Sequence, residues 1–448
     1  MTKEAQIPFF FNPLKSRLLW IFCSVHLLVA VFLGEIFAFA PDEGGYLNIF
    51  KELYSRHFSL VGHLGWVATT PTLFVQVIYL PAKIFTLFGL PDYLALRILA
   101  IALSALSVYL LLCIARHQGS KKKYFSWALI AILLIPTTFL WMTLSLREEF
   151  LFLGFSTFSS GIYLLNLKRT RAAFITLTLG TFFVCYTKGY LFVLLFFAFI
   201  TLLLVRGLMQ RKFTISHGYI AIAVILPLVF APATTKSLVS GCVGQLTGQS
   251  GALVISTDSA GQVVSTQGST TTGALAAEVA ANPDSLFSKF ALKSKIVSTS
   301  TGSSTGSSTV TPAPDAKRVE RLTLQPGHLR QPLTLISSSA RFLFLPSPFI
   351  DNGSKFQNIG SFEEIIWWGL YIFLGFMIFR LIKSRRKIDD LFIWASAFSV
   401  FFIIFSAITE INVGTALRHR SILLIPILAM ILMCQEPKKE ALDVSDPA

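Results

Sequence analysis

Two adjacent carboxylates, Asp42 and Glu43, are the residues best placed for acid–base chemistry. They follow residues 18–40, an almost wholly apolar stretch that is longer than the roughly 20 residues needed to cross a bilayer. An acidic pair beside a membrane costs free energy, and acidic residues contribute little to setting the topology. A function therefore explains this pair better than a role in ending the apolar span. Gly44 and Gly45 follow and would let backbone approach a ligand. A carboxylate within reach of a hydroxyl takes its proton as a general base, and we expect that chemistry here.

Cationic side chains stand in short polar breaks between other apolar stretches. They are Arg147, Lys188 and the run Arg418-His419-Arg420. Arginine binds phosphate oxygens through a planar fork of donors, whereas lysine acts as a compact point charge. These residues are therefore predicted to bind a phosphate or an acidic sugar. Two alternatives stay open, since Arg147 can pair with a neighbouring glutamate and Lys188 can snorkel to the membrane surface.

The composition is that of a polytopic membrane protein. Of 448 residues, 54% are hydrophobic and 14% are charged, whereas a soluble domain has about 25% charged residues. The formal net charge of +15 would suit a nucleic-acid-binding protein. The basic residues, however, fall in short runs between apolar segments, which is typical of cytoplasmic loops. We expect no nucleic-acid partner.

The apolar segments predict an all-α fold. They lie near 18–40, 71–90, 93–115, 125–144, 150–167, 172–187, 190–205, 217–233, 362–382, 390–409 and 421–434. Placing all the basic runs in the cytoplasm requires an odd number of crossings between Asp42 and Arg116. The segment 71–90 contains Pro71, Pro81 and Lys83, which suits an interfacial helix better than a span. We therefore predict about ten transmembrane helices and one interfacial segment.

This topology places both termini in the cytoplasm of a multi-pass plasma-membrane protein. The acidic pair and the cations at 147, 188 and 418–420 then share the external or periplasmic face. Functional groups from distant parts of the chain are thus expected to converge on one side of the membrane.

Three regions follow from the pattern. Residues 1–233 form an N-terminal membrane bundle with a first external loop at 41–92, and residues 362–448 form C-terminal membrane helices with a short cytoplasmic tail. A long external loop, 234–361, separates them. Within 296–311, 13 of 16 residues are Ser, Thr or Gly, so we expect disorder over about 296–316. Residues 317–359 are expected either to pack over the outer mouth of the bundle or to form a solvated loop.

The stretch from Pro41 to Arg116 resembles the amino-terminal region of polyprenyl-phosphate-sugar-dependent glycosyltransferases of the GT-C class, which includes protein O-mannosyltransferases and aminoarabinose transferases. The resemblance is carried by Asp42-Glu43 with Tyr46, by the proline-led segment ending in Leu87-Phe88-Gly89, and by Ala95-Leu96-Arg97. It implies that Asp42 is the catalytic base, that Glu43 orients it or binds substrate, and that Tyr46 lies at the substrate.

The resemblance implies transfer of a sugar from a polyprenyl-phosphate donor to a glycan, lipid or protein acceptor. No metal site is predicted, because Asp42 and Glu43 are too few ligands for a divalent ion and His57 and His63 lack a helical ligand spacing. Some members of this class use a divalent metal, but the ligand spacing in this sequence does not support one. Arg97 and Lys83 are expected to anchor helices at the membrane surface.

Two other functions fit parts of the pattern. A cell-envelope polysaccharide polymerase or ligase would also use outward arginines, with a lipid-pyrophosphate-linked donor. A non-enzymatic lipid-sugar transporter should instead place charge within its spans and have repeat-related halves. The ionisable residues here stand at the ends of the apolar segments, which favours an enzyme.

Overall fold

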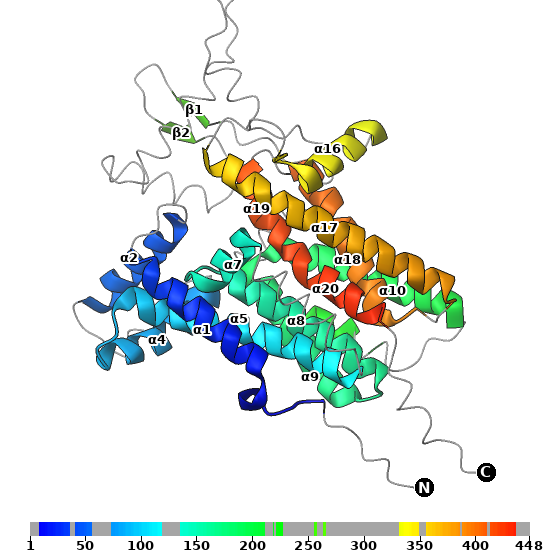
Figure 1. Cartoon of the computed structure of the whole chain (residues 1–448), viewed down its shortest axis with the longest axis horizontal. Helices are drawn as coiled ribbons and strands as arrows, with labels where there is room; N and C mark the ends of the chain where they lie inside the picture. The colour runs from blue at the N-terminus through cyan, green and yellow to red at the C-terminus, as the bar shows by residue number, and fades with distance from the viewer. Residues whose placement is uncertain are drawn as a thin grey trace, which may run out of the picture. The chain divides into compact units, whose positions relative to one another are not determined.

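The described part of the chain is helical apart from two short strands (Figure 1). A computed structural model describes residues 9–35, 41–55, 73–118, 135–210, 218, 221–226, 255–257, 263–265, 331–348, 355–385, 388–409 and 413–435. The chain divides into two compact units, one of residues 1–232 with 324–448 and one of residues 233–323. In the second unit, β1 (Ile255–Thr257) pairs antiparallel with β2 (Val263–Ser265). The stretch expected to be disordered, 296–316, lies outside the described residues.

Five helical stretches among the described residues are long and apolar enough to cross a membrane. They lie in α5 (Asp92–His117), α10 (Gly189–Gln210), α17 (Lys355–Lys383), α18 (Asp390–Thr409) and the succession α19 (Val413–Arg420), η3 (Ser421–Leu423) and α20 (Leu424–Met433). The chain is thus compatible with a helical membrane protein, as the composition predicts. The count of ten spans stays a prediction.

The first apolar helix is shorter than the sequence predicts. A short 3₁₀ turn, η1 (Pro13–Lys15), leads into α1 (Arg17–Phe32), which ends well before residue 40. Gly34 follows with a φ of +64°, a left-handed conformation that terminates helices and suits glycine. Backbone geometry at this glycine is therefore consistent with the end of α1 within the apolar stretch.

The acidic pair lies in a helix rather than in an open loop. It belongs to the first turn of α2 (Pro41–Ser55), where Pro41 and acidic residues are favoured at a helix N-terminus. Gly44 and Gly45 are helical, and a Cβ built on either meets no atom within 4 Å. Both positions thus have open space above the helix, and the expectation that they give a ligand close access to backbone stays a prediction.

The segment after α2 also forms a short helix, α4 (Leu73–Leu87), of which Val77–Leu87 is apolar. It packs on α5, and the Tyr79 hydroxyl donates to the Tyr46 carbonyl oxygen at 2.6 Å. Gly89 ends the segment with a φ of +88°. An interfacial position for this helix stays a prediction.

A tight helical hairpin forms the middle of the first unit. After α7 (Pro136–Thr143) come α8 (Glu148–Asn166) and α9 (Thr170–Thr187), which lie side by side, with α8 packed against α5 (Figure 1). The α8–α9 contact is close at glycines: a Cβ on Gly180 would lie 2.6 Å from the backbone nitrogen of Phe158. The hairpin therefore fixes the start of α8 and the end of α9 relative to each other.

One helix of the long loop also packs on the bundle. It is α16 (Pro332–Phe344), which contacts α18 and α19 and buries Phe342. Of the two alternatives for residues 317–359, the contacts of α16 agree with packing against the bundle rather than with a solvated loop within 331–348, and a position over the outer mouth stays a prediction.

Candidate functional site

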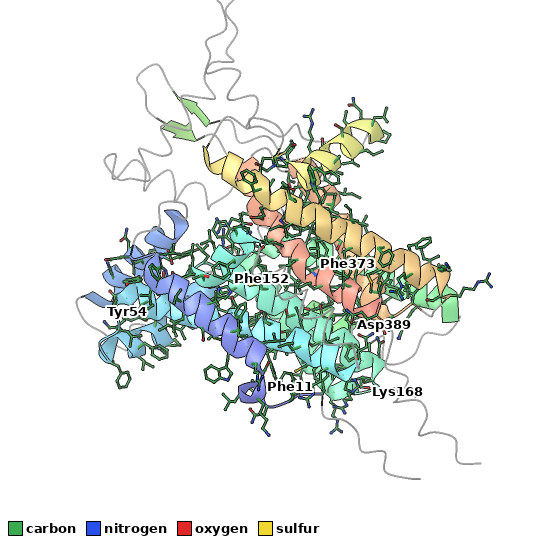
Figure 2. All side chains as sticks on the ribbon, in the orientation of Figure 1. Phe11, Tyr54, Phe152, Lys168, Phe373 and Asp389 are labelled. Atoms are coloured by element: carbon green, nitrogen blue, oxygen red, sulfur yellow. The ribbon has the colours of Figure 1, made fainter. Side chains whose placement is uncertain are left out.

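Charged residues gather where helices of the first unit begin and end. The connections concerned are the start of α2, the α7–α8 junction, the α9–α10 junction and α19. Lys168, which follows α8, lies at the opposite end of the α8–α9 hairpin (Figure 2). The acidic first turn of α8 is favoured by the partial positive charge of a helix N-terminus. This end of the hairpin is therefore distinguished by its ionisable side chains.

Glu148 is the centre of this cluster. Its two carboxylate oxygens accept bidentate hydrogen bonds from Arg418 at 2.8 and 2.9 Å. The Lys188 Nζ lies 3.5 Å from the same carboxylate. The Arg418 guanidinium also lies 5.3 Å from the centre of the Trp141 ring, a cation–π arrangement. Three segments far apart in the sequence thus share one buried carboxylate.

Electrostatics keep this carboxylate ionised. Burial alone would raise the pKa of Glu148, but Lys188, Arg418 and Arg147 outweigh it and hold that pKa at about 2. Burial lowers the pKa of Lys188 to about 8, and the negative charge of Glu148 opposes part of that shift. Near neutral pH the cluster therefore contains ionised Glu148 and protonated Lys188.

Glu149 differs from its neighbour. Within the described residues, neither of its buried carboxyl oxygens has a hydrogen-bond partner. Burial raises its pKa well above the ordinary value, and the negative charges of Glu148 and Glu43 raise it further. The three cations Arg147, Lys188 and Arg418 outnumber the two carboxylates of Glu148 and Glu149, so the cluster has an excess of positive charge whatever the protonation state of Glu149.

Glu43 lies in a second ion pair. It accepts from Arg97 Nε and Nη2, both at 2.8 Å, and from the Ser145 backbone nitrogen and hydroxyl at 3.0 and 3.1 Å. Arg97 also donates to the carbonyl oxygens of Ala30 and Gly34, both at 2.7 Å, at the end of α1. Arg97 is fully buried, so its expected role as a surface anchor is wrong. The pair joins α1, α2, α5 and the α7–α8 junction, and its hydrogen bonds occupy the carboxylate of Glu43.

Arg420 has a different environment from Arg418. It is fully buried, pairs with Glu364 of α17, and donates to the carbonyl oxygens of Phe342 and Leu345 at the end of α16. His419 is half-buried, with its ring centre 6.5 Å from that of Tyr190. The described contacts thus bring Arg418 to Glu148, whereas those of Arg420 tie α16 to the bundle.

The other candidate residues lie around this end. The backbone of Asp42 is in the first turn of α2, and its side chain is outside the described residues. Tyr46 is half-buried and packs against Leu144 and Leu146. Arg147 precedes α8, is half-buried, and has no described partner at Nε. Lys83 lies 5.6 Å from the centre of the Tyr54 ring.

Sequence reasoning overlooked the central role of Glu148. In the motif Leu146-Arg147-Glu148-Glu149, the sequence singles out Arg147 as a phosphate ligand and treats the glutamates only as its alternative partners. The sequence did contain a signal for this role. A carboxylate at the start of an apolar helix is expected to be buried, and a buried carboxylate needs cationic partners from other segments of the chain. Glu363 was also overlooked: it accepts from the Thr137 backbone nitrogen at 2.9 Å and hydroxyl at 2.6 Å, and so caps the start of α7.

Among the described residues, no group of three or more His, Cys, Asp or Glu side chains is arranged to hold a metal ion. No protein-family model, curated protein or solved structure matches this chain. Function is therefore argued from the site itself.

Proposed function

We propose that this chain is an integral membrane glycosyltransferase that moves a sugar from a polyprenyl-phosphate donor to an acceptor on the non-cytoplasmic face. The observation that carries the proposal is the convergence of Lys188 and Arg418 on Glu148. Lys188 and Arg418 come from separate helix ends, and Arg147 adds its charge from the turn before α8. An excess of positive charge at a helix-end cluster is what an anionic headgroup needs for binding.

The reaction requires a proton acceptor and a stabilised leaving group. The acceptor hydroxyl oxygen attacks the anomeric carbon and loses its proton to a carboxylate base. The bond from that carbon to the phosphate oxygen breaks, and its electron pair stays on the phosphate. The donor phosphodiester carries one negative charge and the released polyprenyl phosphate carries two, so negative charge grows in the transition state. Fixed cations that face this phosphate bind the transition state more tightly than the donor.

The residues fit these requirements in distinct roles. Arg418, Lys188 and Arg147 would contact the phosphate, and Glu148 would hold Arg418 and Lys188 in position. Asp42 is assigned as the base on the strength of the family resemblance, with Glu43 and Arg97 holding the start of α2 in place. The Arg418 side chain is 21% exposed, so it is partly accessible to a ligand.

Arg418→Ala should raise the KM for the lipid donor, because it removes a charge-assisted contact to phosphate. A loss of about 1.5–3 kcal/mol corresponds to a rise of roughly tenfold or more. The measurement is initial rate against donor concentration in proteoliposomes.

Arg206→Ala is the matched control for this variant. Arg206 pairs with Asp390 and is 22% exposed, close to the 21% of Arg418, but it belongs to the opposite end of α10. It should leave donor KM unchanged. Equal KM values for Arg418→Ala and the wild type would remove Arg418 from the donor site.

Donor binding should weaken as the pH rises through about 8, because Lys188 then loses its charge. The unfolded lysine has its ordinary pKa of 10.5, so between pH 8 and 10.5 the unfolded state binds more protons. The Lys188 contribution to stability therefore rises with pH in this window, and unfolding does not explain the loss of donor binding.

Donor KM measured from pH 6.5 to 9.5 should show a rise near pH 8. Lys188→Arg should flatten it, since a guanidinium stays protonated; a step that persists in this variant would assign it to another group.

The excess of positive charge also favours a second candidate, a polymerase or ligase that uses a pyrophosphate-linked lipid donor. Such a donor carries an additional phosphate charge. Competition between polyprenyl phosphate and polyprenyl pyrophosphate for labelled donor distinguishes the two: stronger competition by the pyrophosphate would favour the second candidate.

A further inference from the structure

Helix α16 has a buried side and, opposite to it, a stripe of exposed apolar residues. Ser338 and Phe342, one turn apart, are buried against the bundle. On the opposite side, Leu333 is 81% exposed, Ile336 is 65% exposed and Phe344 is 44% exposed. Ala340 is exposed between them, and the spacing places all four on one helical stripe. We call these four residues the outer stripe of α16.

Ring contacts show how far α16 extends along the membrane-length helices. The Phe342 ring lies 6.1 Å from that of Phe402, which is seven residues before the end of α18 at Thr409. At 1.5 Å per residue, this places Phe342 about 10 Å along the helix from that end.

A second helix gives a similar depth. The Phe344 ring contacts the rings of Trp368 and Tyr371 in α17, at 6.4 and 6.1 Å. Trp368 is eight residues after Gly360, where the apolar stretch of α17 begins, which corresponds to about 12 Å. The hydrocarbon core is about 30 Å thick, so each leaflet contributes about 15 Å. The C-terminal end of α16 therefore lies at the level of acyl chains, if α17 and α18 cross the membrane over their apolar stretches.

The surface beside α16 is also apolar. Exposed large hydrophobic side chains follow one side of α17, namely Phe362, Ile365, Ile372, Phe376, Phe379 and Ile382. Phe344 belongs both to the outer stripe and to the ring contacts with α17, so it joins the two surfaces. Arg341 is the single charged residue of Pro332–Phe344 and is half-buried on the flank, where its long side chain can reach toward the headgroups.

We propose that α16 is embedded in the leaflet surrounding the Gly360 end of α17, and that its outer stripe contacts lipid acyl chains. The hydrogen bonds from Arg420 to the carbonyl oxygens of Phe342 and Leu345 hold the deep end of α16 against the bundle. This placement does not depend on the glycosyltransferase proposal, because it uses only packing and depth.

Spin labels test the placement directly. Single cysteines would be introduced at Ile336, at Ile372 of α17 as the lipid reference, and at Leu14, 69% exposed in the turn before α1, as the reference outside the apolar helices. The native cysteines are first replaced. In liposomes of phosphatidylcholine and phosphatidylglycerol, collision rates with oxygen, which concentrates in acyl chains, and with a water-soluble nickel chelate are measured. The label at 336 should resemble that at 372, with frequent oxygen collisions and several-fold fewer nickel collisions than the label at 14.

Two results would overturn the proposal. Frequent nickel collisions at 336 would place the stripe in water, and infrequent collisions with both reagents would show that protein covers it. If the cysteine-free chain does not fold, p-benzoylphenylalanine at position 336 of the otherwise native chain gives a second test. Irradiation in the same liposomes should add a lipid mass to the peptide containing residue 336. Absence of a lipid adduct there, with an adduct formed at 372, would contradict the placement.

Discussion

Asp42→Asn should lower the rate of sugar transfer by about 10²–10⁴, the usual contribution of a general base, with the protein still folded. The amide keeps the size of the side chain and loses the ability to take a proton from the acceptor hydroxyl. Asp42 lies in the first turn of α2, where an asparagine is tolerated. The measurement is single-turnover transfer with saturating donor, together with the thermal midpoint in detergent.

Glu43→Gln is the matched control, since it changes the adjacent carboxylate in the same way. It should act mainly on stability, because it leaves Arg97 buried with an uncompensated charge, a loss of about 3–5 kcal/mol. A normal rate in Asp42→Asn would remove Asp42 as the base. The reverse pattern, with Asp42→Asn unstable and Glu43→Gln stable but inactive, would assign the base to Glu43.

Glu148→Gln should be the most destabilising neutral substitution in the cluster. It leaves Lys188 and Arg418 beside Arg147 without the carboxylate that all three face, and breaking a buried pair by removing one partner costs about 3–5 kcal/mol. The expected result is a markedly lower thermal midpoint and weak expression.

A double variant tests whether like-charge repulsion is the reason. Adding Lys188→Met to Glu148→Gln removes one of the unopposed cations and should recover part of the lost stability. Additive destabilisation in the double variant would contradict coupling between Lys188 and Glu148. So would a Glu148→Gln protein as stable as the wild type.

The sequence predicts where ionisable residues can stand better than it predicts their partners. Lys188 and Arg418 occupy breaks in the apolar pattern, as Arg147 does, and the structure brings the first two to one carboxylate. Glu43 and Arg97 are 54 residues apart, and only the packing of α2 against α5 reveals that they pair. Arg97 looked like a surface anchor because sequence alone does not show which side of an apolar helix is buried.

Element boundaries depart from the apolar pattern for local reasons. Gly34 and the hydrogen bonds from Arg97 set the end of α1. A hydropathy pattern reveals neither of them. The start of α2 falls in the predicted external loop 41–92 because the hydropathy pattern marks the end of an apolar stretch and does not reveal the less apolar helix that follows it. Helix α16 was missed as an element because it is only 13 residues long and follows a long polar stretch.

The close contact between α8 and α9 has a consequence for how this protein can vary. A Cβ at Gly180 would meet the Gly154 carbonyl oxygen at 2.8 Å as well as the backbone of Phe158, so neither helix can yield by turning a side chain. The hairpin would have to widen, and Lys188 at its end would move away from Glu148 at its start. Selection that preserves the charge cluster should therefore also preserve Gly180. This residue has no functional group and lies about two helical turns from Lys188 along α9. Natural variants of this chain are expected to tolerate exchange of many apolar residues on the outer side of the hairpin and very few at this glycine.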